Sequence, residues 1–248
     1  MSAINVTLET ANIFLREMGY ESIEQFRKEY GLNHTGPIDE RDLRAMAIKR
    51  CGVRFGQARG STTKLHTNRP KVFVRHRLTN SLLRDKFDEK LLAGLNMWSK
   101  VADIQFSLTN IEGDAQIEVQ TKQIDGPANT LAFAYFPQGA GWRLPLVFDT
   151  AEAWEEPSGP DFECTACHEG GHNCGIDHDP TAQGIMAAFY NPRITVPTST
   201  WEINEMVSRY GKPVPITPSQ PPTPPTQPPV SKRRVVITGE NLRIEEFQ

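Results

Sequence analysis

The sequence predicts an α+β protein, and three observations lead to that class. Apolar residues recur at helical spacing through residues 1–50, short strand-like runs alternate with helical stretches over residues 71–211, and a proline-rich segment follows. A chain of 248 residues is long enough to bury a core of its own. We therefore expect one main domain over residues 71–211, with smaller parts before and after it.

The first part, residues 1–53, is expected to contain three short helices. Ser22 and Gln25 fit a capping box at the start of the second helix. Gly31 fits the end of that helix, and Asp39 fits the cap of the third. A small helical bundle is the simplest interpretation of this part.

A connector over residues 54–70 precedes the main domain. It is polar, rich in Gly and Thr and without periodicity, so we expect it to be exposed. In the main domain we expect about five strands, at residues 71–78, 104–108, 115–120, 131–136 and 144–149. The helices are expected at residues 81–98, from near Pro160, and at 201–210.

Two further segments follow the main domain. Residues 212–230 are expected to form an extended linker, because about half of that segment is proline. The pattern of residues 231–248 predicts a single β-hairpin. A lone hairpin is marginally stable at best, so this one must dock, pair with another chain or stay loose.

Charge and hydropathy exclude several function classes. The formal net charge is −3, from 27 Lys+Arg and 30 Asp+Glu, so neither nucleic acid nor an anionic membrane is expected as a partner. No apolar run approaches the roughly 18 residues of a membrane span. The first ten residues, MSAINVTLET, lack the basic and apolar regions of a secretory signal.

Residues 164–178 carry a zinc-site pattern. His168, Glu169, His172, Gly175 and His178 follow the order HExxHxxGxxH. On a helix the first two histidines lie one turn apart on the same face, and the glycine can end the helix so that the third histidine turns back toward them. Three neutral imidazoles leave one open position on a tetrahedral zinc ion, which is typical of a catalytic site. Zinc lowers the pKa of water there to about 7, and the glutamate can accept its proton.

Two other interpretations compete with this one. The five fixed positions arise by chance with odds on the order of one in a hundred thousand, so chance is set aside. Cys164-Thr-Ala-Cys167-His168 also fits the attachment pattern of a c-type haem, but haem leaves the rest of the zinc pattern without a role. We expect Cys164, Cys167 and Cys174 to be small buried core residues.

The segment is similar to the signature of metzincin metallopeptidases, and most closely to that of the matrixins. Met186 matches the family's Met-turn, and residues 125–137 resemble its calcium loop and edge strand. Residues 1–53 resemble a peptidoglycan-binding-like prodomain. Over residues 5–211 the resemblance implies a metzincin catalytic domain, with a twisted sheet of about five strands and three helices, preceded by a three-helix prodomain.

Lys49-Arg50-Cys51-Gly52-Val53 resembles the family's cysteine switch. The resemblance implies that Cys51 is the fourth zinc ligand of a latent form, where its thiolate excludes the water. Lys49 stands where the family has a proline, and the acidic partner of the switch arginine is replaced around Arg54-Phe55, so weaker latency is expected. The alternative is an ordinary surface thiol after a helix.

The resemblance also bears on further metal ions. The positions of the family's second, structural zinc are occupied by Glu118, Gln120, Phe133 and Val147. The last two cannot bind metal, so one zinc is expected. Asp125, Asp149 and Glu152 match the family's calcium carboxylates and suit a hard cation, with solvated surface acids as the alternative.

Some positions match less well. Asp179 resembles the reprolysin branch, but the short spacing to Met186 and the switch motif favour the matrixins. Tyr190 matches the wall of the S1′ subsite, although Ala188 stands where the family has a proline. The remaining histidines, which are expected at the surface or on strands, are His34, His66 and His76.

Together these observations predict a zinc-dependent endopeptidase made as a latent proenzyme, with Glu169 as general base and proteins or peptides as substrates. Activation needs a cut within residues 54–70, where Arg59 and Lys64 are expected to be exposed. One alternative is a binding protein whose helical unit holds cell-wall glycan, and another is the haem protein. The resemblance implies an extracellular location, although the N-terminus shows no recognisable signal.

Overall fold

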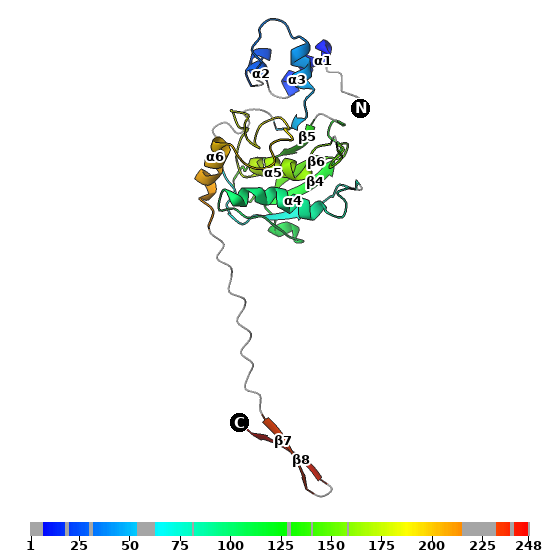
Figure 1. Cartoon of the computed structure of the whole chain (residues 1–248), viewed down its shortest axis with the longest axis vertical. Helices are drawn as coiled ribbons and strands as arrows, with labels where there is room; N and C mark the ends of the chain where they lie inside the picture. Colours follow the sequence, from blue (N-terminus) through cyan, green and yellow to red (C-terminus); the bar gives the residue numbers. More distant parts are fainter. Residues whose placement is uncertain are drawn as a thin grey trace. The chain divides into compact units, whose positions relative to one another are not determined.

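The structure is a computed structural model. It describes residues 7–17, 20–29, 32–53, 63–80, 82–127, 130–139, 141–157, 159–214, 232–238 and 241–247. The chain divides into two units, Met1–Val214 and Pro215–Gln248. The helices are α1 (Leu8–Glu17), α2 (Ile23–Glu29), α3 (Glu40–Met46), α4 (Phe87–Leu95), η1 (Asn96–Lys100), η2 (Glu112–Asp114), α5 (Phe162–Asn173) and α6 (Thr200–Tyr210) (Figure 1). The strands are β1 (Arg50–Cys51), β2 (Lys71–Val74), β3 (Ser107–Leu108), β4 (Ile117–Lys122), β5 (Thr130–Ala134), β6 (Leu144–Asp149), β7 (Lys232–Thr238) and β8 (Asn241–Phe247).

A mostly parallel sheet forms the centre of the first unit. Its strand order is β1-β5-β6-β4-β2-β3, and β5 against β6 is its antiparallel pair. Helices α4 and α5 lie on one face of this sheet (Figure 1), and their apolar residues share one core with the strands. Because α5 packs against β5 and β6, the zinc-site pattern lies beside the edge of the sheet.

Most predicted strands are confirmed. Those expected at residues 115–120, 131–136 and 144–149 are β4, β5 and β6. The predictions for β2 and β3 were too long, and the sheet has a sixth described strand, β1. Two residues are too few to show the alternation that predicts a strand, so the sequence could not reveal β1.

The helix predicted over residues 81–98 begins later than expected. Residues 82–86 form turns, in which the Asn80 side chain accepts the N–H of Leu83 at 3.0 Å. The regular helix α4 starts at Phe87, and after Leu95 the chain tightens into the 3₁₀ helix η1. The apolar spacing therefore predicted the packing face but not the helix start.

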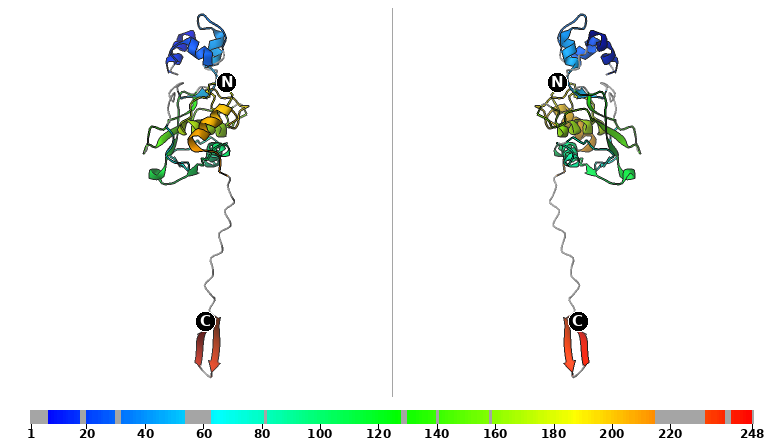
Figure 2. Two further views of the ribbon diagram at one scale, coloured as in Figure 1. Left: turned by 90° about the vertical axis from the view of Figure 1, so that its left-hand side faces the viewer. Right: turned by 90° about the vertical axis from the view of Figure 1, so that its right-hand side faces the viewer.

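Helices α1, α2 and α3 gather around a small core of their own (Figure 2). Asp39 caps α3 as predicted, since its side chain accepts the N–H of Arg41 at 2.8 Å. The surface position predicted for His34 is wrong: its side chain is 8% exposed, and its Nε2 lies 3.1 Å from Oδ1 of Asp42. Gly31, the predicted helix end, lies outside the described residues.

The Arg27–Asp42 ion pair should be important for this helical unit. Arg27 Nε and Nη2 donate to the two carboxylate oxygens of Asp42 at 2.9 and 2.7 Å, and the Asp42 side chain is fully buried. These bonds lower the pKa of Asp42 to about 2. Its contribution to stability is present above its unfolded pKa of about 3.9 and is lost as the pH falls toward 2.

We expect Asp42→Asn to lower the free energy of unfolding of the helical unit by about 3–5 kcal/mol, because a buried guanidinium loses its counter-charge. Amide hydrogen exchange of α2 and α3 in the full chain measures this loss. The exposed pair Arg44–Glu40 offers a control, since Glu40→Gln should change the exchange little. Equal effects of the two substitutions would contradict this interpretation.

The described part of the connector, residues 63–70, is exposed only in part: Thr63, Lys64, His66 and Arg69 are exposed as predicted, whereas other residues pack against the main domain. Leu65 is buried, and its N–H donates to the hydroxyl of Tyr210 at 3.0 Å. The side chains of Thr63 and Lys64 also donate to carbonyls of the main domain. A cut at Lys64 would disturb this packing, so we expect the activating cut before Thr63; Arg59 lies outside the described residues.

The second unit contains the predicted hairpin. β7 and β8 pair antiparallel, with Lys232 opposite Phe247 and Thr238 opposite Asn241. Most of the predicted linker over residues 212–230 lies outside the described residues. Among the helices that are described, none is long and apolar enough to cross a membrane.

Candidate metal centre

Helix α5 positions two of the expected ligands and the expected base. The helix begins after Asp161, whose side chain accepts the N–H of Cys164 at 2.8 Å. His168 and His172 then lie on the same side of the helix, with their Nε2 atoms 3.1 Å apart. Glu169 is fully buried next to them. The local pattern thus forms a helix in the place where the sequence predicts one.

Close packing explains the two glycines in this helix. A Cβ atom on Gly171 would lie 2.4 Å from Sδ of Met186, and one on Gly170 would lie 2.6 Å from Cδ2 of Leu95. Met186 therefore packs directly against α5, and this contact offsets the roughly 1 kcal/mol that each helical glycine costs. Beyond the helix, Gly175 has a φ of 91°, and its left-handed conformation turns the chain toward His178.

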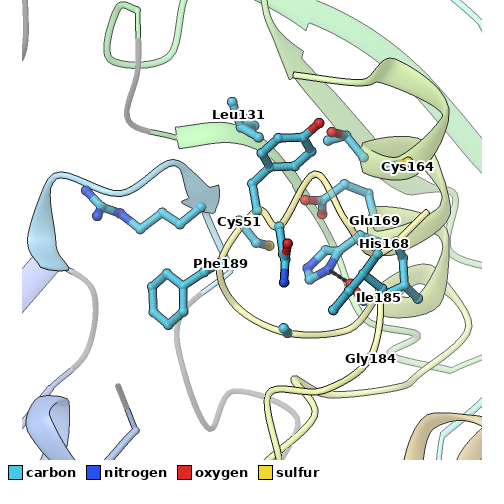
Figure 3. A pocket seen from close by; sticks show the side chains of 14 residues that line it. Cys51, Leu131, Cys164, His168, Glu169, Gly184, Ile185 and Phe189 are labelled. Carbon is cyan, nitrogen blue, oxygen red and sulfur yellow. Dashed lines mark hydrogen bonds between the residues drawn. The ribbon is translucent and has the colours of Figure 1, made fainter. Parts of the chain in front are cut away.

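Four side-chain donor atoms converge at one point. Nδ1 of His168 forms a hydrogen bond with the carbonyl of Ile185 at 2.6 Å, and Nδ1 of His172 forms one with the carbonyl of Ile176 at 2.8 Å. Because the Nδ1 atoms are held in this way, both Nε2 atoms face the centre of the group. Cys51 Sγ lies 3.4 Å from Nε2 of His172, and Figure 3 shows Cys51 beside His168 and Glu169. The residues whose donor atoms all lie within 4.8 Å of one another are Cys51, His168, His172 and His178.

This donor set fits zinc. Both ring nitrogens of His178 and both carboxylate oxygens of Glu169 are buried, and none has a hydrogen-bond partner in the described part of the chain. Such orphaned groups are costly unless a cation and its water satisfy them. Burial lowers the pKa of His168 to about 4, and it holds the pKa values of His172 and His178 well below their usual range. All three imidazoles are therefore neutral at pH 7, as zinc ligation requires.

The other two groups are also affected by burial. Burial raises the pKa of Glu169 to about 8. It also raises the pKa of the Cys51 thiol, and the nearby Glu169 charge adds to that increase. A cation among the three imidazoles would favour the carboxylate and the thiolate instead, so the chemistry of both groups depends on the metal.

The segment that carries Cys51 lies along the edge of the sheet as an added strand. β1 pairs parallel with β5, and the N–H of Gly52 donates to the carbonyl of Ala132 at 2.7 Å. On its other side, the N–H of Cys51 donates to the carbonyl of Ala188 at 3.1 Å. An extended peptide held by main-chain bonds on both sides resembles a substrate bound by strand addition.

Arg50 is anchored by the helical unit. Its guanidinium carbon lies 4.2 Å from the ring centroid of Phe14, and its Nη1 donates to the carbonyls of Met46 and Ile48. A cation at the C-terminus of α3 is favoured by the helix dipole, and the aromatic contact adds to this. The switch segment thus has an anchor that the sequence pattern did not reveal.

A small pocket lies beside Glu169 (Figure 3). Its wall includes Leu131, Phe189 and Tyr190. The Tyr190 hydroxyl accepts the N–H of Asp161 at 2.8 Å, which ties this wall to the start of α5. Tyr190 therefore lines this pocket, and its role as a wall of the S1′ subsite stays a prediction.

The other cysteines agree with the prediction of buried core residues. Cys164, Cys167 and Cys174 are free and buried, and burial raises the pKa of each thiol. Haem attachment would need the first two thiols at one haem edge. Cys167 is fully buried in the core, and His168 belongs to the metal-sized group, so the haem alternative is not favoured.

The expected calcium carboxylates do not gather into one compact group. Asp149 is buried and accepts the N–H groups of Ala151 at 2.8 Å and Asp125 at 3.3 Å. Glu152 lies 3.2 Å from the Nζ of Lys49. Among the described residues these three acids form no set of oxygens within 4.8 Å of one another. Calcium binding stays a prediction.

The positions of the family's second zinc hold other interactions. Glu118 is buried and paired with Arg75 and Arg143, at 2.5 and 2.7 Å. Gln120 Nε2 donates to Glu118 at 2.7 Å. Phe133 and Val147 lie opposite each other on β5 and β6. A single zinc stays the prediction for this chain.

Glu202 is a site residue that the sequence analysis missed. Its fully buried carboxylate accepts the N–H of Met186 at 2.9 Å and those of Thr198 and Ser199 at 2.6 and 3.0 Å. It therefore fixes the turn beneath the ligands from α6. The Ser199-x-x-Glu202 capping box signals the start of that helix, but nothing local signals the bond to Met186.

We expect Glu202→Gln to lower the free energy of unfolding by about 2–3 kcal/mol and to weaken zinc binding, because one amide oxygen cannot replace two charged acceptors. Chemical unfolding and zinc competition with a chromogenic chelator measure the two effects. Glu205, which pairs with Arg209 on the same helix, gives the control Glu205→Gln. Unchanged zinc affinity in Glu202→Gln would contradict the role assigned to this residue.

Comparison with known families decides the classification. A family model described as Matrixin matches residues 71–211. The chain belongs to the matrixin family. The resemblance of residues 71–211 to the matrixins is therefore confirmed, whereas the prodomain and the cysteine switch stay predictions. Asp179 does not change this assignment; it is buried and its side chain accepts the N–H of Thr181 at 2.8 Å.

Several curated matrixins are similar over most of this chain. Stromelysin-1 of Equus caballus is 30% identical over 208 residues, which are 78% of this chain and 43% of that protein. Matrix metalloproteinase-27 of Homo sapiens is 30% identical over 213 residues, or 81% and 41% of the two chains. Macrophage metalloelastase of Rattus norvegicus is 27% identical over 246 residues, which are 92% of this chain and 52% of that protein. The chain spans about half the length of the curated relatives it matches.

Proposed function

We propose that this matrixin is a zinc-dependent endopeptidase made as a latent proenzyme. The observation that carries the proposal is the position of Cys51, whose Sγ lies 3.4 Å from His172 Nε2 within the group formed by the three histidines. The thiol comes from a segment that fills the cleft like a peptide. The helical unit over residues 1–53 would then act as an inhibitor in cis.

The residues that would hold the zinc are His168, His172 and His178, with Cys51 as fourth ligand in the latent form. When bound, zinc supplies a Lewis acid for the peptide carbonyl and an acidified water. The buried Glu169 would accept a proton from that water and pass it to the leaving amine. The backbone of β5 would bind the substrate as an added strand, in the place that the switch segment occupies in this structure.

The experiment is cleavage of casein by the full chain before and after limited proteolysis of its connector. We expect low activity before the cut, a marked rise after it, and loss of activity with 1,10-phenanthroline that added zinc restores. Protein without activity after a confirmed cut and with a full complement of zinc would overturn the proposal.

Neither alternative function gains support. The relatives give no indication of a cell-wall glycan partner, and an intact Glu169 among three histidines is not needed in a pure binding scaffold. Protein or peptide substrates follow from the peptidase family. An extracellular location stays a prediction that the family resemblance carries.

A further inference from the structure

Asn173 links the metal-binding helix to the edge of the sheet. It is the last residue of α5, follows His172 directly and is fully buried. Its side-chain amide donates to the carbonyl of Tyr135 at 2.9 Å and to that of Pro145 at 3.3 Å. Because Tyr135 follows β5 and Pro145 belongs to β6, one side chain joins α5 to both strands.

These contacts fix the Ala134 end of β5. Ala134, the last residue of β5, is paired with Leu146, and the N–H of Tyr135 donates to the carbonyl of Pro145 at 3.1 Å. The ring of Phe136 then lies 5.1 Å from the ring of His172. A shift of this strand end would therefore move the substrate-binding edge relative to the ligands.

The amide is used here only as a donor. Oδ1 of Asn173 is buried and has no hydrogen-bond partner in the part of the chain that the structure describes. The carbonyl of Pro145 also accepts the N–H of Tyr135, so Asn173 is the donor that joins both carbonyls to α5. An aspartate at this position would have nearly the same shape but would set a negative charge against both carbonyl oxygens.

The backbone groups of β5 point alternately toward β6 and away from it, and this alternation shows which residues could bind a peptide. In β5 the carbonyl of Ala132 faces outward and accepts the N–H of Gly52 from the switch segment. Backbone groups two residues apart face the same side, so those of Ala134 also face outward. A long peptide bound along β5 would use both positions, whereas a short one would use only the first.

We propose that Asn173 is a positioning residue for peptide substrates. It holds the Ala134 end of β5 so that a peptide bound along this strand is aligned with the metal site. This inference rests on the proposed function. It predicts a defect that depends on substrate length: long peptides should bind less well to an Asn173 variant, while short peptides should be unaffected.

The test compares Asn173→Ala and Asn173→Asp with wild type in the processed full chain, using an octapeptide and a tetrapeptide that share one scissile bond. We expect Asn173→Ala to raise KM for the octapeptide about tenfold and Asn173→Asp to raise it further, with KM for the tetrapeptide and the zinc content unchanged. Equal changes for both peptides, or loss of zinc, would overturn the inference.

Asn96→Ala is the matched control. The Asn96 side chain makes two bonds with the backbone of Phe106, at 2.8 and 3.1 Å, within the same domain. This variant should lose stability without a KM defect for either peptide, so a merely structural role of Asn173 would make the two variants behave alike.

A second measurement needs no turnover. Hydrogen exchange of the amides of residues 133–136 should be faster in Asn173→Ala than in wild type and unchanged in Asn96→Ala. If the processed wild type cleaves neither peptide, the proposed function fails, and these exchange rates still decide whether Asn173 holds the strand. Wild-type exchange rates in Asn173→Ala would overturn the inference.

Discussion

Glu169→Gln is expected to lower kcat of the processed enzyme by about 10²–10⁴-fold, because a glutamine cannot accept a proton from the attacking water or return one to the leaving amine. The substitution keeps the size of a fully buried side chain that lies outside the group of four donors, so zinc content and KM should change little. Initial rates on a fluorogenic peptide, with zinc measured in the same samples, give both results.

The matched control for this variant is Glu163→Gln, on the same helix. Glu163 is paired with Lys90 at 2.8 Å and lies on the first turn of α5, away from the donor group. The kcat of Glu163→Gln should stay within about twofold of wild type, because a partly exposed ion pair contributes little. A Glu169→Gln enzyme that keeps more than about a tenth of wild-type kcat would exclude Glu169 as the general base.

Cys51→Ala is expected to make the unprocessed chain active. Without the thiolate the fourth zinc position is open to water, so the full-length variant should cleave casein at least about tenfold faster than unprocessed wild type. We expect only part of the processed activity, because the main-chain bonds of Gly52 and residue 51 still hold the segment in the cleft. Limited proteolysis should then raise the activity further.

Cys174→Ala serves as the control for loss of a buried thiol. Cys174 directly follows α5 as its C-cap residue but does not belong to the group of four donors, so this variant should stay latent. Full latency of unprocessed Cys51→Ala, at wild-type zinc content, would exclude the thiol as the cause of latency.

The sequence alone predicted that the three histidines come together, because their geometry is local. Spacing of four residues on a helix sets His168 and His172 on one face, and a glycine after the helix turns His178 toward them. The family motif then pointed to Cys51, and the structure places that thiol with the histidines. Proximity of this kind could be predicted from short stretches of the chain.

Other features could not be predicted, because they depend on contacts between distant segments. The bonds from Glu202 to Met186 and from Asn173 to Tyr135 join elements whose relative positions no local pattern records. The same is true of Arg50, which the helical unit holds through Phe14. Helical periodicity also missed the late start of α4, since local turns compete with the helix there.

The central claim is that Cys51 completes the coordination of a catalytic zinc in the latent chain. X-ray absorption at the zinc edge of the full-length wild type tests it most directly. We predict three nitrogen ligands at about 2.0–2.1 Å and one sulfur at about 2.3 Å, and a shell of nitrogen and oxygen only in full-length Cys51→Ala. A sulfur-free shell in the unprocessed wild type would contradict the account.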